Sequence, residues 1–388
     1  MSRRAPDEDD VRSRPNPRGS RPRTKQRPRH EDAVPGLVLT VDRGRSTVLV
    51  DGAEVTAVRS RELGRTGVVV GDAVHLVGDT SGDPGTIARV VRVDERRTVL
   101  RRSADDDDPV ERVLVANADQ LAVVVAAADP EPRTGLVDRC LVAALDAGMD
   151  VLLVVTKGDL ADPAAFVAGY AALDLPSVVL RRAARPDGTP VVDDEGRPRH
   201  DPAGLAVLRE RLAGRTTVLV GHSGVGKSTL VNALVPDAAR ATGRVNDVTG
   251  RGRHTSSSAL ALRLPATAPG DGGRDGGRDD ARDGGTDDGP AGWVVDTPGV
   301  RSFGLAHVRP SSLLAAFPDL EPGEEGCPRG CSHDEPECGL DAWVASGAAG
   351  PAGPARLESL RRLLRSRAGG EEAGGAPVRP DVPAAGSR

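Results

Sequence analysis

The segment Gly221-His222-Ser223-Gly224-Val225-Gly226-Lys227-Ser228 decides the fold, because it has the glycine and lysine spacing of a phosphate-binding loop. An apolar run, Thr216–Val220, comes directly before it, and a helical pattern over Lys227–Leu234 follows. In such a setting, backbone N–H groups and the positive helix end receive phosphate groups. We expect the whole segment and Thr229 to contact a nucleotide, with Lys227 bridging the β- and γ-phosphate oxygens and Ser228 binding Mg²⁺.

A second segment, Thr156-Lys157-Gly158-Asp159, follows the apolar run Val151–Val155 and predicts which base is bound. The Asp159 carboxylate can accept hydrogen bonds from both N1–H and the 2-amino group of guanine, whereas adenine lacks both donors. Lys157 can lay its methylene stem over the base. Thr156 departs from the asparagine that is usual at the first position. The loop alone does not separate ATP from GTP, but this segment favours GTP and GDP.

The lysines support both assignments. Of 52 basic residues only three are lysine, and two of these, Lys157 and Lys227, lie in the two nucleotide segments. A compact ammonium group fits between phosphate oxygens where the planar fork of arginine does not. The sequence therefore indicates a chemical demand for lysine at these positions.

A third segment, Asp296-Thr297-Pro298-Gly299, follows the apolar residues Trp293–Val295. We expect Asp296 to hold Mg²⁺ through water and the N–H group of Gly299 to meet the γ-phosphate. The next residue is Val300, whose side chain cannot orient an attacking water, so intrinsic hydrolysis should be slow.

The stretch Gly250–Ser256 lies along the chain between the phosphate-binding loop and Asp296–Gly299, is rich in hydroxyl groups, and has the composition of a switch loop. Thr255 is the candidate for a second Mg²⁺ hydroxyl. His254 is the candidate for ordering the attacking water, although a solvated loop histidine is the more common case.

The order of the segments is reversed, because the guanine-reading segment precedes the phosphate loop. Ordinary GTPases carry them the other way round, so the sequence predicts a circularly permuted GTPase domain over residues 112–307. Apolar runs and helical patterns alternate from Leu121–Ala128 onward, which is typical of an α/β doubly wound parallel sheet. A Gly/Asp/Arg-rich insert at 268–290 should be flexible.

Residues 35–104 precede this domain and contain five short β-rich runs separated by Gly and Asp turns. They predict a small β-barrel of the OB-fold or SH3-like type, of which we favour the OB-fold. The region has eleven arginines and no aromatic residue, so RNA could be held by arginine–phosphate contacts but not by base stacking. The tails, 1–34 and 368–388, should be disordered, the first of them basic.

Cys327-x3-Cys331-x-His333-x4-Cys338 predicts a metal site in the C-terminal part, residues 308–367. Three thiolates and one imidazole suit a tetrahedral, structural Zn²⁺. Cys140, on an apolar helical face, is expected to be a core residue. A helical pattern over Ala355–Arg367 indicates that this part is mainly helical, and its arginines, with the basic tail, are further candidates for RNA contacts.

The composition limits the number of domains and the cellular compartment that we expect. With 388 residues the chain has room for two or three domains, and a net charge of −5 means that any basic surface is local. No run of eighteen apolar residues and no secretory leader is evident, so we expect no membrane association. Four cysteines, three of them beside a histidine, favour a metal site in the reducing cytosol.

The three nucleotide segments in permuted order, between a small barrel and a Cys-Cys-His-Cys cluster, closely resemble the RsgA family of ribosome-small-subunit-dependent GTPases. The resemblance covers about residues 36–367. It also includes Asn117–Gln120, Asp138-Arg139, Gly250–Thr255 and Phe303–Leu305. It implies a cytoplasmic GTP hydrolase that acts late in maturation of the 30S ribosomal subunit, with faster hydrolysis on the 30S particle and with 16S rRNA as partner. We expect a monomer.

The sequence departs from the family in two places. The gap between the first two cysteines and the gap between the histidine and the last cysteine are both shorter than is common in the family. The Ser/Ala segment expected to contact the base after Ser177–Leu180 is not evident in Arg181-Arg182-Ala183-Ala184. Two other functions stay open: a P-loop GTPase or ATPase acting outside the ribosome, and a guanine-nucleotide-regulated RNA-binding scaffold. Guanine preference and stimulation of turnover by 30S subunits would separate them.

Overall fold

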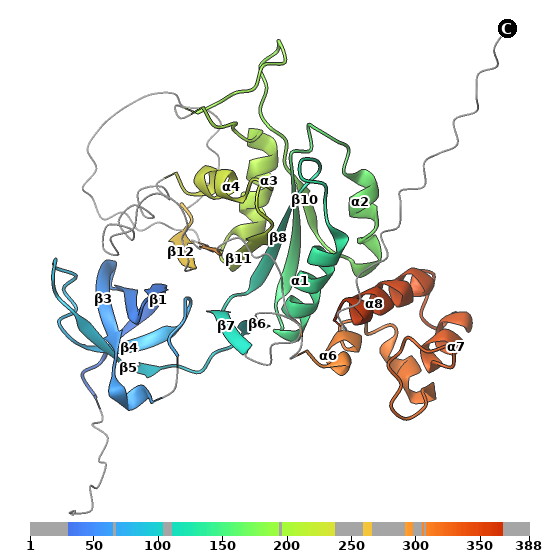
Figure 1. The fold of residues 1–388 in the computed structure, drawn as a ribbon, viewed down its shortest axis with the longest axis horizontal. Helices are drawn as coiled ribbons and strands as arrows, with labels where there is room; N and C mark the ends of the chain where they lie inside the picture. Colours follow the sequence, from blue (N-terminus) through green and yellow to red (C-terminus); the bar gives the residue numbers. More distant parts are fainter. Residues whose placement is uncertain are drawn as a thin grey trace, which may run out of the picture. The chain divides into compact units, whose positions relative to one another are not determined.

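The computed structural model describes residues 30–64, 67–103, 111–193, 196–236, 259–265, 292–297, 305 and 308–367 (Figure 1). The predictions for His254, Thr255, Gly299 and Val300 lie outside the described residues, as do those for the 268–290 insert and for nearly all of both tails.

The N-terminal part is the five-stranded barrel that its β-rich runs predicted. Its strands are β1 (Val34–Asp42), β2 (Arg45–Val50), β3 (Ala53–Arg59), β4 (Ala73–Gly78) and β5 (Ala88–Val93). They are ordered β1-β2-β3-β5-β4, and β4 pairs back onto β1. Only the β3–β5 pair is parallel. In β2 alternate residues are buried, as expected for strands with one face on a core.

The central part is a mostly parallel sheet with strands in the order β10-β9-β8-β11-β13-β12. These strands are β8 (Gln120–Ala126), β9 (Asp150–Thr156), β10 (Ser177–Val179), β11 (Thr216–Gly221), β12 (Leu260–Arg263) and β13 (Trp293–Asp296). All neighbouring pairs are parallel except β12–β13, which is antiparallel. The doubly wound sheet is therefore confirmed, and the sequence did not reveal β12, which pairs with both β13 and β1.

Helices cover both faces of this sheet, which explains the continuous apolar runs of its strands. They are α1 (Thr134–Asp146), α2 (Ala164–Ala168), α3 (Pro202–Leu212) and α4 (Lys227–Leu234). Every residue of β8 is buried. Leu121 and Val123 belong to a core with α1 residues, whereas Ala122 and Val124 belong to one with residues of α3 and α4. The alternation of side chains along a strand produces these two cores.

The strand order also explains how a permuted chain assembles the usual site. From β8 the chain moves to β9 and then β10 on one side, and it returns through α3 to β11 on the other side of β8. The order of strands reverses between β8 and β11, and in open parallel sheets ligands bind at the carboxyl ends of the strands beside such a point. Both the end of β9 and the end of β11 lie there.

A hairpin of β6 (Val99–Ser103) and β7 (Glu111–Ala116), which was not predicted from the sequence, connects the barrel to the central sheet. The C-terminal part is helical, with α6 (Pro310–Leu314), the 3-10 helix η4 (Glu321–Gly326), α7 (Gly339–Ala345) and α8 (Gly353–Arg367). Buried leucines mark one face of α8, as its pattern predicted: Leu357, Leu360, Leu363 and Leu364. Among the residues that the structure describes, none forms a helix long and apolar enough to cross a membrane.

Candidate nucleotide-binding site and zinc centre

The phosphate loop joins the end of β11 to the start of α4. Gly224 and Gly226 have φ angles of 84° and 92°, in the left-handed region that glycine adopts without a steric penalty. A Cβ atom on Gly221 would lie 2.5 Å from the backbone oxygen of Val124 in β8. Glycine is thus required both for the turn and for the close approach of the loop to β8. Ser228 is exposed in the first turn of α4.

Lys227 reaches from α4 to the end of β13. Its Nζ atom donates hydrogen bonds to Oδ1 of Asp296 and to the backbone oxygen of Thr297. Thr297 is itself held to β11, because its hydroxyl donates to the backbone oxygen of Leu219 at 2.8 Å. The structure therefore brings together the phosphate-loop lysine and the carboxylate expected to hold Mg²⁺. The Ser228 hydroxyl and the Asp296 carboxylate are oxygen ligands of the kind that Mg²⁺ prefers.

The segment Thr156–Asp159 lies at the end of β9 and contacts the phosphate loop directly. The Thr156 hydroxyl lies 2.5 Å from the backbone oxygen of Val225 and 3.1 Å from that of Val125. The Thr156 side chain is buried, and its hydroxyl is therefore engaged within the protein. Lys157 has a φ of 55° and donates from Nζ to the backbone oxygen of Asp129. Thr156, which departs from the usual asparagine, thus links the two segments.

Asp159 is bound to Arg182, which follows β10. The backbone N–H of Arg182 donates to Oδ1 at 3.0 Å, and its Nε atom donates to Oδ2 at 2.6 Å. Burial acts to raise the pKa of Asp159, but these hydrogen bonds outweigh it and lower that pKa below its usual value. A second base-contacting segment was expected after Ser177–Leu180, and in that stretch it is Arg182 that lies against Asp159.

Residues 181–201 form an excursion between β10 and α3, and its neck is closed by a bridge between Arg182 and His200. His200 is buried, and among the described residues neither ring nitrogen has a hydrogen-bond partner. Burial lowers the pKa of His200, and the nearby charge of Asp159 acts in the opposite direction. No feature of the sequence singled out this histidine.

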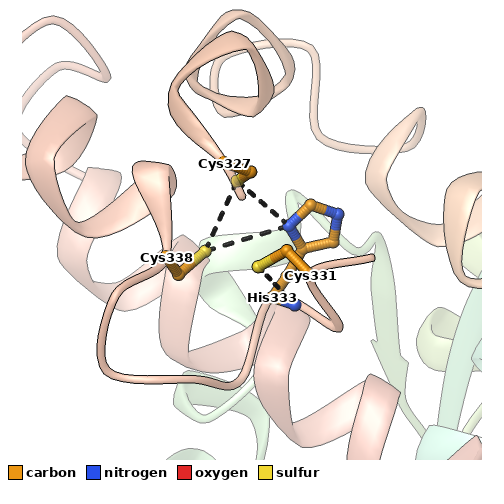
Figure 2. Close-up of side chains that lie close together, drawn as sticks. All are labelled: Cys327, Cys331, His333 and Cys338. Carbon is orange, nitrogen blue, oxygen red and sulfur yellow. Dashed lines mark hydrogen bonds between the residues drawn. The ribbon is translucent and has the colours of Figure 1, made fainter. Parts of the chain in front are cut away.

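The four predicted zinc ligands meet at one point (Figure 2). The Sγ atom of Cys327 lies 3.8 Å from that of Cys338, and the Nδ1 atom of His333 lies 3.6 Å from the first and 3.8 Å from the second. Bonds of about 2.3 Å to sulfur and 2.0 Å to nitrogen in a tetrahedron give edges of about 3.8 and 3.5 Å, so these residues fit zinc. All four ligand atoms, including Sγ of Cys331, lie within 4.8 Å of one another.

Two local features position these ligands. Cys327 directly follows the end of η4 and Cys338 directly precedes the start of α7, so a helix end fixes the backbone at each of these two ligands. The backbone N–H of His333 donates to Sγ of Cys331 at 3.3 Å. Burial raises the pKa of Cys331 to about 12 and also raises that of Cys338, so both thiols keep their protons until a cation displaces them.

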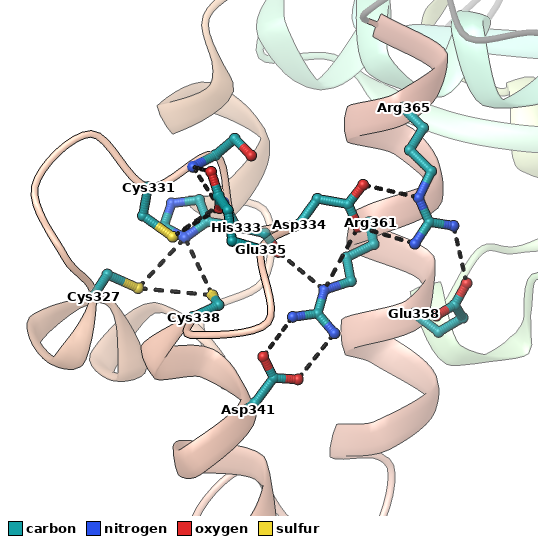
Figure 3. A network of polar contacts seen from close by, with 11 residues as sticks. Cys327, Cys331, His333, Asp334, Glu335, Cys338, Asp341, Glu358, Arg361 and Arg365 are labelled. Carbon is teal, nitrogen blue, oxygen red and sulfur yellow. Dashed lines mark hydrogen bonds and ion pairs between the residues drawn. The ribbon is translucent and has the colours of Figure 1, made fainter.

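Two arginines of α8, Arg361 and Arg365, bind the loop that carries the zinc ligands (Figure 3). Arg361 donates to the backbone oxygen of His333 at 2.9 Å and binds Asp341 through both terminal nitrogens. Four of the five arginines proposed above as RNA contacts are paired with carboxylates: Arg356 with Asp319, Arg361 with Asp341, Arg362 with Asp138 and Arg365 with Asp334. These pairings engage four of the five arginines within the protein, and RNA contact by this helix stays a prediction.

Comparison with known proteins agrees with this geometry. A family model described as RsgA GTPase matches residues 93–270. The small ribosomal subunit biogenesis GTPase RsgA of Paraburkholderia xenovorans (strain LB400) is 34% identical over 290 residues, which are 73% of this chain and 78% of that protein. The protein of the same name from Ectopseudomonas mendocina (strain ymp) is 33% identical over 302 residues, or 77% and 75% of the two chains.

Two solved structures are similar in fold. The crystal structure of YjeQ from Thermotoga maritima has a TM-score of 0.54 at 24% identity, covering 87% of this chain and 99% of that one. The structure of YloQ, described as a circularly permuted GTPase, has a TM-score of 0.53 at 19% identity, covering 88% and 98%. The permuted arrangement predicted from the order of the segments is thereby confirmed.

Proposed function

This chain belongs to the RsgA GTPase family, and we propose that it hydrolyses GTP while bound to the 30S ribosomal subunit, late in the maturation of that subunit. The observation that supports this most is the meeting of three segments at the carboxyl ends of β9, β11 and β13. There the Thr156 hydroxyl contacts the phosphate loop, and Lys227 of that loop contacts Asp296.

In this proposal different groups of the chain bind the phosphates, the base and Mg²⁺. Backbone N–H groups of the loop Gly221–Gly226 and the start of α4 receive the phosphates, and Lys227 moves from Asp296 to the β- and γ-phosphate oxygens. Asp159 accepts from the guanine base. Ser228 and, through water, Asp296 hold Mg²⁺, which neutralises phosphate charge when bound. We retain Thr255, Gly299 and His254 as proposed contributors.

The zinc ligands are proposed to have a structural role. Three cysteines and one histidine leave no open position on a tetrahedral zinc, so the site has no place for a reacting water. We also propose that the domains keep the expected boundaries, 35–104, 112–307 and 308–367. The hairpin of β6 and β7 then forms the connection between the first two.

Contact with 16S rRNA is proposed for the barrel rather than for α8. Arg43, Arg45 and Arg89 of the barrel are exposed, whereas the described arginine side chains of α8 are paired with carboxylates. Because the barrel has no aromatic residue for stacking, its contacts would be to phosphates and would weaken steeply with salt. A monomeric, cytoplasmic protein is part of the same proposal.

The test is GTP turnover with and without purified 30S subunits, with 50S subunits as the matched control. We expect 30S subunits alone to raise the turnover. Turnover that is unchanged by 30S subunits would favour action outside the ribosome. Guanine-nucleotide-dependent binding to 30S without any change in turnover would favour the RNA-binding scaffold.

A further inference from the structure

The ion pair between Asp159 and Arg182 stands at the position where the base is expected. The side chains are 25% and 32% exposed, so both can reach a ligand. Arg182 uses three donors on this carboxylate: its backbone N–H on Oδ1, and Nε and Nη2, each 2.6 Å from Oδ2. A carboxylate accepts about four hydrogen bonds, so one position is left for the two donors of guanine.

The other side chains of the base-reading segment direct hydrogen bonds to backbone oxygens. Guanine carries acceptors at O6 and N7, which Asp159 cannot serve. The single hydroxyl proton of Thr156 is directed to Val225 or Val125 within the buried interior. The Lys157 ammonium is bound to the backbone oxygen of Asp129. None of these contacts assigns a donor to O6, and the guanidinium of Arg182, from a neighbouring segment, lies beside Asp159.

Arg182 has the required chemistry in the required place. The Watson–Crick edge of guanine presents two donors, N2–H and N1–H, followed by one acceptor, O6. A carboxylate beside a guanidinium presents two acceptors followed by a donor, which is the complementary order. Arginine is also the side chain that most often contacts O6 of guanine in DNA recognition.

The fold holds Arg182 in this place from both sides. The backbone N–H of Asp201 donates to the oxygen of Arg181, and the N–H of Ala183 donates to the oxygen of Arg199, each at 2.8 Å. These bonds close the neck of the 181–201 excursion around Arg182. His200, buried without a hydrogen-bond partner among the described residues, lies across the same bridge.

We propose that Arg182 is a specificity-determining residue that donates a hydrogen bond to O6 of guanine while Asp159 accepts from N1–H and N2–H. On binding, one guanidinium N–H leaves Oδ2 of Asp159 for O6, which frees the acceptor position that the second base donor needs. This inference rests on the proposed nucleotide site, in which Asp159 reads the base.

The experiment measures the affinities of GDP, IDP and 6-thio-GDP by competition with a fluorescent GDP. IDP lacks the 2-amino group but keeps O6, whereas 6-thio-GDP keeps both donors and replaces O6 by sulfur, a weak acceptor. We expect Arg182→Ala to weaken GDP and IDP by the same factor, about 10- to 100-fold for a charged donor. The preference of the wild type for GDP over 6-thio-GDP should disappear.

Other outcomes overturn the proposal. If Arg182 only orients Asp159, Arg182→Ala will instead erase the preference for GDP over IDP and leave the preference for GDP over 6-thio-GDP intact. If Arg182 competes with the base for Asp159, the Arg182→Ala variant will bind GDP more tightly than the wild type. Unchanged affinities in this variant would exclude a role of Arg182 in recognising the base.

Three further variants keep the test interpretable. Arg182→Lys, which retains a donor, should keep part of the thio preference even if the alanine variant folds poorly. Arg185→Ala is the matched control, because the side chain of this arginine in the same excursion donates to Thr189 and to the backbone oxygen of Pro190. Asp159→Asn tests the underlying site separately: if it leaves base choice unchanged, the assignment of the nucleotide site fails, whatever Arg182 does.

Discussion

The Thr156 hydroxyl lies 2.5 Å from the backbone oxygen of Val225, and this contact joins two segments separated by 69 residues. The contact forms in a permuted chain because β9 and β11 both pair with β8, on opposite sides, which brings the ends of the two strands close together. A buried carbonyl that loses its partner costs about 1–3 kcal/mol. The contact therefore stabilises the conformation of the phosphate loop as well as the fold.

Thr156→Val should weaken both folding and nucleotide binding, because valine keeps the shape of threonine but cannot donate to Val225. We expect a loss of about 1–3 kcal/mol in unfolding free energy and a clear rise in the dissociation constant of GDP. Thr217→Val is the control, since this buried strand threonine bonds to Gln120 and not to the loop. Equal GDP affinities for the two variants would refute a specific role for Thr156.

Asp159→Asn should weaken GDP and GTP binding by about 1.5–3 kcal/mol, because a charge-assisted acceptor pair becomes a single amide oxygen. Its amide N–H should also favour xanthine nucleotides, whose 2-oxo group replaces the amino donor. Calorimetric titration with GDP and XDP measures both effects. Asp187→Asn, a change in an exposed turn carboxylate bound to Thr189, should leave both affinities unchanged.

The Asp159–Arg182 pair should stabilise the fold in a pH-dependent way. The folded-state pKa of Asp159 is lowered, so its contribution to stability is complete above the unfolded-state value of about 3.9 and is lost as pH falls through the folded-state value. The melting temperatures of wild type and Asp159→Asn should therefore differ by a constant amount near neutral pH and converge below about pH 4. A difference that grows on acidification would contradict this sign.

Cys331→Ser should lower the zinc content of the purified protein and increase protease cleavage around residues 320–345. Losing one of four ligands destabilises a structural site, whereas the phosphate loop belongs to a different element and should keep its nucleotide affinity. Cys140→Ala is the matched control, because Cys140 is a buried core residue of α1. Reduced wild-type protein without stoichiometric zinc would end the structural-zinc proposal.

A non-hydrolysable GTP analogue should tighten binding to 30S subunits relative to GDP, and 30S subunits should tighten binding of the analogue by the same factor. The physical reason is the chain path, because β13 ends at Asp296, beside Lys227, and the chain then continues into the helical C-terminal part. Co-sedimentation in both nucleotide states provides the measurement. Equal affinities for 30S subunits in the two states would exclude this coupling, and the GTPase assignment would still stand.

Much of the fold was predictable because its signals are local. The five barrel strands, the alternating strands and helices from β8 to α4, and the leucine face of α8 all follow from periodicity and turn residues. The hairpin of β6 and β7 and the antiparallel strand β12 were missed. The acidic stretch 104–110 separates β6 from β7, and the partners of β12, which are β13 and β1, lie far from it along the chain. Neither pairing has a local sequence signal.

By itself, the sequence determined the motifs of this protein: a phosphate-loop pattern, a carboxylate expected to read the base, a permuted order and a four-ligand cluster, because each depends on residue type and on order along the chain. Only the tertiary structure decided which partners those groups have. It placed Arg182 on Asp159 and Thr156 on the phosphate loop, and it paired the arginines of α8 with carboxylates. These contacts join residues far apart along the chain, and their geometry depends on how the strands are ordered in the sheet.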